Sequence, residues 1–301
     1  MKRRDLFRAG LAAGGAFAFA SRRVNAATEV VNPLKPPAQG LIPVAFLISD
    51  GAVVIDFAGP WEVFQDVMLD DLHMPFHPYT VAASPKKIQA SGGLQIVPDF
   101  TFANAPVPKV IVIPAQGDDS PAVLNWIRKS SQTADVTMSV CTGAFLLAKT
   151  GLLDGKSATT HHNSYKVFEK QFPNITLKRG ARFVDDGNLA SAGGLTSGMD
   201  LAMHVVQRYF GREVAQSNAF YMEYQGNGWK DASGAANTEY TNYKIRAGYE
   251  EDPVCGMEIK PGELKAEYKG VTYHFCMESC RQQFLKSPES YLNPTPKRKS
   301  M

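Results

Sequence analysis

A cysteine stands at a sharp change of sequence pattern in the middle of the chain. Before Cys141 apolar residues alternate, as is typical of a strand, and after it an apolar run has helical spacing. The small residues in Thr142-Gly143-Ala144 allow a steep turn. A helix N-terminus behind the sulfur favours the thiolate. The stretch therefore predicts a nucleophilic cysteine at a strand–helix corner, with a buried structural cysteine as the alternative.

The other three cysteines lie close together near the C-terminus. Cys276 and Cys280 are four residues apart, so they share a face if a helix begins there, and Cys255 approaches from a preceding turn. Three thiolates form a soft site suited to Cu(I) or Zn(II). His274, on the same predicted strand face as Cys276, is a candidate fourth ligand, and Met257 is a softer candidate that favours copper. A disulfide between two of the cysteines is the alternative, although an odd number leaves one unpaired.

The elements around Cys141 predict how the chemistry is positioned. Apolar strands such as Leu41–Ser49 and Lys109–Gly117 alternate with helical segments. This order predicts an α/β fold with a doubly wound, mostly parallel, flavodoxin-like sheet, followed by a small α+β domain. Reacting groups in such sheets lie at the carboxyl ends of the strands. Cys141, Gly117 and the segment from Asp56 to Glu62 each follow a strand, so we expect them to converge.

Composition divides the chain into six segments. The first residues contain the pair Arg3-Arg4 before a weak apolar run and a small-residue cleavage site at Val24-Asn25-Ala26, which predicts a signal peptide for the twin-arginine translocase and a periplasmic location. The alternative is an uncleaved leader or membrane anchor. The predicted segments are a signal peptide over 1–26, a linker over 27–40, a main domain over 41–226, a linker over 227–249, a small domain over 250–293 and a basic tail over 294–301.

The charge distribution argues against nucleic acid as a partner. The formal net charge is +3, but the predicted signal peptide holds six basic residues and one acid, so the remaining body is slightly acidic. The basic tail is too short to change this. The expected partners are a small-molecule substrate, a metal ion and the translocase, and the sequence leaves a homodimer open.

Three motifs in the main domain resemble the ThiJ/PfpI superfamily, which has a glutamine-amidotransferase-like fold. They are FAGPWEVF from Phe57, SVCTGAFLLAKTGLLDGKSATTHH from Ser139 and LASAGGLTSGMDLAMHVVQRYFG from Leu189. Within the superfamily the sequence is most similar to isonitrile hydratases and to the sensing domains of AraC-type regulators. In those regulators a helix-turn-helix region follows the domain, whereas here a cysteine-rich segment follows it. This disfavours a DNA-binding regulator.

The resemblance to isonitrile hydratases implies a set of catalytic residues. Cys141 attacks the electrophilic carbon, Asp56 is the partner acid or base, and Thr142 hydrogen-bonds near the reacting atoms. Glu62 matches a glutamate that many superfamily members place beside the cysteine, where burial keeps the carboxyl protonated. For Asp56 a helix N-cap is an equal and compatible interpretation, and for Glu62 the alternative is an exposed charge on a helix face. No cofactor is expected at Cys141.

The loop opposite the cysteine departs from the superfamily pattern. Pro-Gly-Gly, which often contributes a backbone N–H to an oxyanion site, is replaced by Pro114-Ala115-Gln116-Gly117. Gln116 and Gly117 remain the candidate backbone donors. His161 and His162 are interpreted as strand-end packing residues without a catalytic role.

The C-terminal segment resembles a YHS domain, a small module associated with heavy metals, through DPVCGM from Asp252 and YHFCMESC from Tyr273. Three functions follow from the two resemblances. The first is a cysteine-dependent hydratase or hydrolase, isonitrile hydratase-like, acting on a small electrophile. The second is a periplasmic copper-binding or copper-resistance protein that uses the older fold as a scaffold. The third is a small-molecule sensor that needs a partner protein to transmit its signal.

Overall fold

The computed structural model describes residues 32–231 and 238–292. The predicted signal peptide, 1–26, and the predicted basic tail, 294–301, lie outside these ranges, so the twin-arginine interpretation stays a prediction. Among the helices of the described ranges, none has the length and apolar character that crossing a membrane requires.

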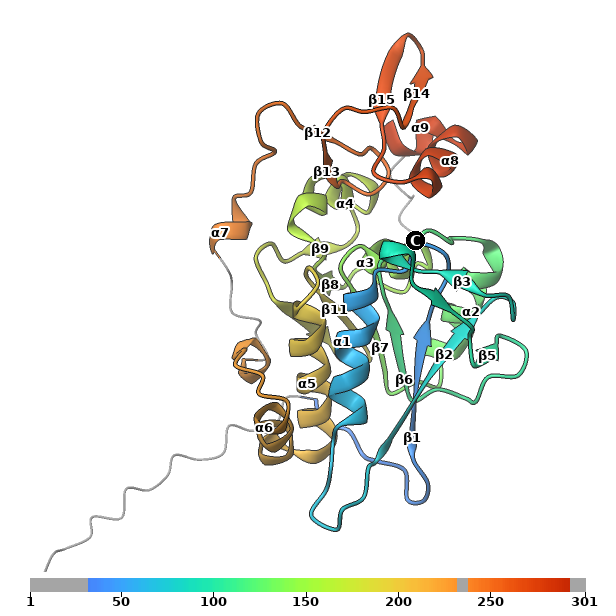
Figure 1. Ribbon diagram of the computed structural model, residues 1–301. Coiled ribbons are helices and arrows are strands. Elements are labelled where there is room, and N and C mark those ends of the chain that lie inside the picture. The colour runs from blue at the N-terminus through green and yellow to red at the C-terminus, as the bar shows by residue number, and fades with distance from the viewer. Residues whose placement is uncertain (1–31, 232–237, 293–301) are drawn as a thin grey trace, which may run out of the picture.

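A seven-stranded sheet forms the centre of the larger domain (Figure 1). All of its neighbouring strands are parallel except β10 and β11, which form an antiparallel hairpin at one edge. This confirms the predicted mostly parallel α/β fold. The strand order is β10 (Phe183–Asp186), β11 (Leu189–Ala192), β7 (Val136–Val140), β6 (Val110–Ile113), β1 (Ile42–Leu47), β2 (Phe76–Ala82) and β5 (Phe100–Thr101).

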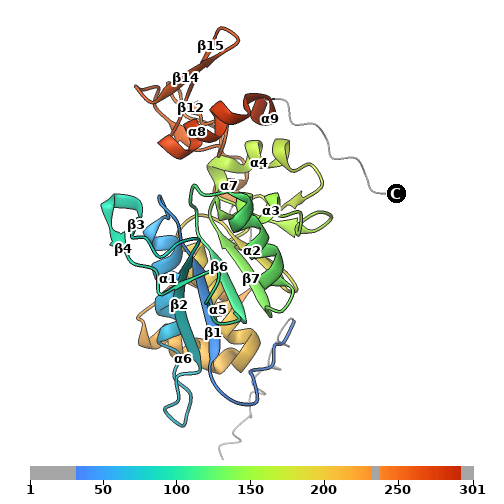
Figure 2. The same ribbon diagram turned by 90° about the vertical axis from the view of Figure 1, so that its right-hand side faces the viewer.

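Helices cover both faces of this sheet, which explains why its inner strands are apolar throughout (Figure 2). In β6, Val110 and Val112 pack into the core on one face, whereas Ile111 and Ile113 pack into the core on the other. The first face carries α1 (Val54–Gln65), α5 (Ser197–Phe210) and α6 (Arg212–Tyr221); the second carries α2 (Pro121–Ser131), α3 (Gly143–Lys149) and α4 (Tyr165–Gln171). Short strand pairs join β3 (Ile88–Gln89) to β4 (Gln95–Ile96) and β8 (Ser157–Ala158) to β9 (Thr176–Leu177).

The predicted linker over 227–249 contributes to the main core. Trp229 lies in a 3-10 turn, Gly228–Lys230, and is only 1% exposed. Its Nε1 donates to the carbonyl oxygen of Gly226 at 3.1 Å. The packing of the main domain therefore continues past residue 226, and a single buried indole in a Gly/Asn-rich stretch gives no periodic signal that would predict it. Further along, α7 (Thr238–Thr241) precedes the small domain.

The small domain consists of two antiparallel strand pairs and two helices around a compact aromatic core. Phe284 is fully buried at its centre and packs against Tyr273 and Phe275, with ring centroids 5.0 and 5.2 Å away. Its elements are β12 (Glu250–Glu251), β13 (Glu258–Ile259), β14 (Lys265–Tyr268), β15 (Val271–His274), α8 (Glu278–Lys286) and α9 (Pro288–Leu292).

This small domain lies over the end of the sheet at which the parallel strands β1, β6 and β7 finish (Figure 1). The Nε2 atom of Gln283 donates to the carbonyl oxygen of Gly117 at 2.8 Å. Two glycines allow close approach, because a Cβ on Gly117 would lie 2.6 Å from Cβ of Ser279 and one on Gly256 would lie 2.7 Å from Cα of Ser164. The two domains therefore meet directly above the strand ends where catalytic groups were predicted.

Candidate active site and metal centre

Cys141 occupies a strained turn between strand β7 and helix α3. Its φ is +57°, a left-handed conformation that few non-glycine residues adopt. Its N–H donates to the carbonyl oxygen of Gly193 at 2.9 Å. A Cβ on Gly143 would lie 2.1 Å from the carbonyl oxygen of Ile113, so only glycine fits where α3 begins beside β6. The predicted strand–helix corner is therefore present, with its strain localised at the cysteine.

Asp56 is the carboxyl group beside this cysteine. It is fully buried, and its Oδ2 accepts a hydrogen bond from the N–H of Ala115 at 3.1 Å. Burial raises the pKa of Asp56 to about 7, against the lowering effect of hydrogen bonds from the Ala115 N–H and the Cys141 thiol. Val53 is the N-cap of α1, so the N-cap interpretation of Asp56 is wrong. Asp56 lies within the first helical turn and points inward.

Burial also decides the resting state of Cys141. It raises the pKa of the Cys141 thiol well above its usual value, and the negative charge of Asp56 adds to the increase. Hydrogen bonds from the N–H groups of Thr142 and Leu195 and from the Thr142 hydroxyl act in the opposite direction but are the smaller effect. The seven-residue helix α3 does not outweigh burial, so the expected thiolate is instead a neutral thiol with a base beside it.

Glu62 does not lie beside the cysteine, which corrects the prediction based on the superfamily motif. It is exposed on α1, where Gln65 Nε2 donates to its Oε2 at 3.5 Å. It is six positions after Asp56 in the helix, so the two carboxyl groups point to different sides of the helix. The alternative interpretation, an exposed charge on a helix face, is the one that fits.

Thr142, Gln116 and Gly117 all line the cavity onto which Cys141 opens. The side chain of Gln116 is anchored by its Nε2, which donates to the carbonyl oxygen of Leu47 at 3.0 Å. The carbonyl oxygen of Gly117 accepts from Gln283 of the small domain. The structure thus brings the predicted oxyanion loop to the cavity, while its donation to a reacting oxygen stays a prediction.

His161 also lines this cavity, although its sequence context predicts a packing role at a strand end. Its Nδ1 accepts from the N–H of Asn163 at 3.3 Å, and its ring centroid lies 4.2 Å from that of His162. Burial, together with His162, lowers the pKa of His161 to about 4. The imidazole is therefore neutral at pH 7. The adjacent pair His161-His162 was the available signal, but pattern alone does not show which ring reaches the cavity.

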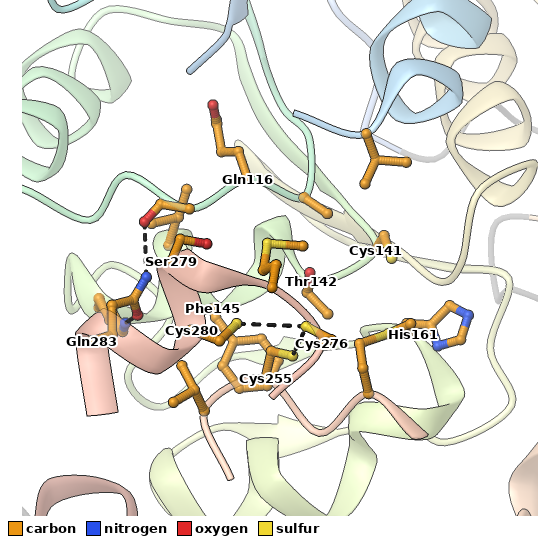
Figure 3. A pocket seen from close by; sticks show the side chains of 18 of the residues that line it. Gln116, Cys141, Thr142, Phe145, His161, Cys255, Cys276, Ser279, Cys280 and Gln283 are labelled. Atoms are coloured by element: carbon orange, nitrogen blue, oxygen red, sulfur yellow. Dashed lines mark hydrogen bonds between the residues drawn. The ribbon is translucent and has the colours of Figure 1, made fainter. Parts of the chain in front are cut away.

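The three C-terminal cysteines converge as predicted (Figure 3). Sγ of Cys276 lies 3.5 Å from Sγ of Cys255 and 3.7 Å from Sγ of Cys280. All three are free cysteines rather than disulfide-bonded ones. Zn–S bonds of about 2.3 Å in a tetrahedral site place two sulfur atoms about 3.8 Å apart, so these separations fit a thiolate-bound soft metal. Thiol donors from its two neighbours lower the pKa of Cys276 far below its usual value.

Asp252 completes this cluster, and sequence reasoning did not assign it a role. Ligand atoms of Asp252 and the three cysteines all lie within 4.8 Å of one another. Its Oδ1 accepts from the N–H of Val254 at 2.8 Å, and its Oδ2 accepts from the N–H of Cys276 at 2.8 Å. Asp252 therefore joins the two chain segments that supply Cys255 and Cys276. The signal was its place in DPVCGM, directly before the first cysteine turn.

His274 is not part of the cluster, which corrects its assignment as a fourth ligand. Its Nδ1 lies 2.8 Å from Oε2 of Glu250 instead. The prediction assumed that the strand alternation continued to Cys276, but β15 ends at His274. Met257, the softer candidate, lines the cavity beside the cluster.

One cavity of about 390 Å³ connects the two sites. Cys141, Thr142 and His161 line it from the larger domain, and the cluster cysteines line it from the small domain (Figure 3). All four cysteines of the chain therefore open onto the same space, which the sequence, with its two separate motifs, gave no reason to expect.

Comparison with known proteins agrees with both halves of this description. Residues 43–208 match the model of the DJ-1/PfpI family, and residues 251–295 match that of the YHS domain. A ThiJ/PfpI family protein from Pseudomonas syringae superposes with a TM-score of 0.56 at 28% identity, covering 64% of this chain and 79% of that one.

Three curated relatives match the chain over different lengths. Isonitrile hydratase of Pseudomonas putida is 33% identical over 186 residues, covering 60% of this chain and 78% of that protein. The HTH-type transcriptional regulator GbdR of Pseudomonas aeruginosa is 28% identical over 57% of this chain, which spans only 48% of the regulator. A copper-transporting P-type ATPase of Rhizobium leguminosarum bv. viciae is 46% identical over 43 residues, 14% of this chain and 5% of that protein. The chain belongs to the DJ-1/PfpI family and carries a YHS domain at its C-terminal end.

Proposed function

We propose that the protein is a cysteine-dependent hydratase or hydrolase that acts on a small electrophile such as an isonitrile. The observation that supports this most is the pairing of Cys141, held at φ +57°, with a fully buried Asp56 whose pKa is raised to about 7. A carboxyl group with that pKa can take a proton from a neutral thiol and return it near physiological pH. The likeness to isonitrile hydratase supports the substrate class.

Cys141, Asp56 and Thr142, with one water molecule, suffice for the hydration of an isonitrile. Asp56 takes the proton of the Cys141 thiol as sulfur forms a bond to the terminal isonitrile carbon. Asp56 then returns that proton to the carbon, which gives a thioimidate. Water adds to the C=N bond, the S–C bond breaks, and sulfur regains a proton, so that an N-substituted formamide leaves. Thr142 hydrogen-bonds to the sulfur as its charge develops.

We propose that Cys255, Cys276 and Cys280 hold a soft metal ion, Cu(I) or Zn(II). Their sulfur separations and the YHS match support this proposal. When bound, the ion supplies a Lewis-acidic, thiophilic centre at the small-domain wall of the cavity. Asp252 holds the backbone N–H groups that orient two of the ligands.

A second candidate function is copper binding or resistance, with the DJ-1/PfpI domain as a scaffold. The local likeness to a copper-transporting ATPase favours it. The two functions differ in what Cys141 does, because a scaffold has no need of a nucleophile beside a base. A sensor role would need a partner protein, since the regulator-like region here is followed by a YHS domain.

Hydration of tert-butyl isonitrile by the full chain tests the enzyme proposal. We expect the reduced protein to form N-tert-butylformamide, and the Cys141→Ser variant to form none above the buffer rate. Product formation at the same rate by both proteins would show that Cys141 is not the nucleophile. Metal bound at one ion per chain without any hydration would favour the copper-binding function.

We also propose export to the periplasm through the twin-arginine pathway, from Arg3-Arg4 and the site at Val24-Asn25-Ala26. Replacing both arginines by lysine should leave the precursor in the cytoplasm. Export that continues unchanged, or that continues in a strain lacking the translocase, would overturn this proposal.

A further inference from the structure

The cavity between the two domains has a consistent chemical character that neither domain match explains. Six of its lining residues carry sulfur, and they come from both sides. They are Cys141 from the DJ-1/PfpI domain and Cys255, Met257, Cys276, Met277 and Cys280 from the YHS domain. Sulfur is polarizable and weakly hydrated, so such a wall favours soft, apolar ligands over hard, strongly hydrated ones.

Apart from the three cluster cysteines, the fixed charge that lines the cavity is already paired. Among the described residues that line it, Lys149 has the permanent charge, and its Nζ lies 2.8 Å from Oδ2 of Asp119 and 3.3 Å from Oε1 of Gln283. His161 is neutral at pH 7 because burial lowers its pKa to about 4. Away from the cluster cysteines, a charged ligand would therefore lose its hydration without gaining an unpaired counter-charge.

The YHS domain forms one wall of the space in front of Cys141. Met277, the N-cap of α8, lies near the loop after β1, with its Sδ 3.8 Å from the position of a Cβ on Gly51. Ser279 and Gln283 of α8 meet Gly117 of the predicted oxyanion loop. A ligand at Cys141 is therefore enclosed by residues of α8 as well as by the DJ-1/PfpI domain.

We infer that this cavity is a single composite ligand site, closed on one side by Cys141 and on the other by Met277 and the thiol cluster, which takes a small, neutral molecule with a soft carbon or sulfur donor. Isonitriles belong to this class, as do small uncharged thiols. The inference rests on the proposed function for its substrate class and adds that the YHS domain determines which substrates fit. The volume of the cavity, about 390 Å³, is in the range of small-molecule pockets.

The test uses the full chain with zinc bound and with Cys141→Ala, so that binding is measured without turnover. Titration calorimetry with tert-butyl isonitrile should show saturable binding. Met277→Trp, which fills the cavity from the YHS side without changing a cluster cysteine, should weaken it about tenfold or more. Met68→Trp is the matched control, because Met68 is an exposed methionine that does not line the cavity; it should leave binding unchanged. Zinc content and thermal unfolding of each variant report whether it is folded and loaded.

A charged probe tests the neutral-ligand claim separately. Isocyanoacetate, an anion of comparable size, should bind at least about tenfold more weakly than tert-butyl isonitrile. Equal binding of the two probes, or equal binding of tert-butyl isonitrile by the folded Met277→Trp and Met68→Trp variants, would overturn the inference. Binding without hydration by the wild-type chain would contradict the proposed function alone, whereas unchanged hydration by Met277→Trp would contradict the composite site alone.

Discussion

The two domains each bury an aspartate beside a cysteine, and use it differently. Asp56 and Asp252 are both fully buried, and burial raises the pKa of each to about 7. Both oxygens of Asp252 accept backbone N–H groups that lead to the cluster cysteines. Asp56 accepts one such hydrogen bond at Oδ2, and among the described residues no N–H or O–H group donates to its Oδ1. The same side chain is thus a structural tie in one domain and an available proton acceptor in the other.

The cysteines beside them differ in the same way. Burial and the charge of Asp56 raise the pKa of Cys141, although two backbone N–H groups and the Thr142 hydroxyl donate to its sulfur. Cys276 receives hydrogen bonds from two thiols, so its pKa falls despite burial. A thiol that needs a base suits a nucleophile that is activated only when substrate is bound, whereas a pre-formed thiolate suits a metal ligand.

The largest expected effect is the loss of the spare carboxylate oxygen. Asp56→Asn keeps the size of the side chain but removes the base, so kcat/KM for isonitrile hydration should fall about 10²–10⁴-fold. Glu62→Gln, on the exposed side of the same helix, is the matched control and should leave kcat/KM unchanged. Equal loss in both variants would mean that charge on α1, rather than Asp56 itself, supports activity.

The second effect concerns Asp252, which accepts hydrogen bonds from the backbone beside the cluster cysteines. Asp252→Asn replaces one accepting oxygen by an NH₂ group, which cannot accept from the N–H of Cys276. Zinc or Cu(I) affinity should fall about 10–100-fold, as is usual for a group that orients metal ligands. Competition with a chelator of known affinity measures this change. His274→Ala should have little effect, because His274 pairs with Glu250 outside the cluster; a larger loss than in Asp252→Asn would restore His274 as a ligand.

The pH dependence of activity reports the ionisation of Asp56. Because Asp56 must be ionised to take the thiol proton, kcat/KM should rise with pH up to an inflection near its raised pKa of about 7. The inflection should vanish from the residual activity of Asp56→Asn.

The stability of the fold should change with pH in the opposite direction to kcat/KM. A carboxyl whose folded pKa lies above its unfolded value favours folding most at low pH, and this contribution is lost as pH rises from about 4 to 7. Asp56→Asn should therefore flatten the fall of the unfolding free energy over that interval, measured by denaturant titration. If the unfolding free energy falls with pH as steeply in Asp56→Asn as in the wild type, Asp56 is not the group with the raised pKa.

The smallest effect concerns domain docking. Gln283→Ala removes the hydrogen bond from Nε2 to the carbonyl oxygen of Gly117 and should weaken docking by about 1 kcal/mol. Hydrogen exchange should become faster in the loop around Gly117 and in α8. Gln282→Ala is the control, because Gln282 bonds to Glu278 of its own helix. Faster exchange in both variants would point to a loss of helix stability instead.

Sequence reasoning predicted those parts of the structure that follow from local pattern. Alternating strands and helices predicted the parallel sheet, and the residues around Cys141 predicted its corner. The spacing of Cys276 and Cys280 predicted their meeting. Each of these depends on neighbours within a few residues.

Features that depend on tertiary packing were not predictable in this way. Glu62 and Asp56 lie in one short segment, and only the rotation of α1 against the sheet decides which of them is buried. His274 and Cys276 alternate in sequence, but the strand ends between them. The shared cavity depends on domain docking through close contacts at Gly117 and Gly256, which no single motif encodes.

Identification of the sulfur that binds substrate covalently tests the central assignment most directly. The zinc-bound full chain is mixed with tert-butyl isonitrile, quenched in acid during turnover, digested, and analysed by mass spectrometry. The expected result is an adduct of one isonitrile on the peptide that contains Cys141, absent in Cys141→Ser and absent from the peptides of Cys255, Cys276 and Cys280. An adduct on the cluster cysteines, or product formation by Cys141→Ser at the wild-type rate, would contradict the assignment of Cys141 as the nucleophile.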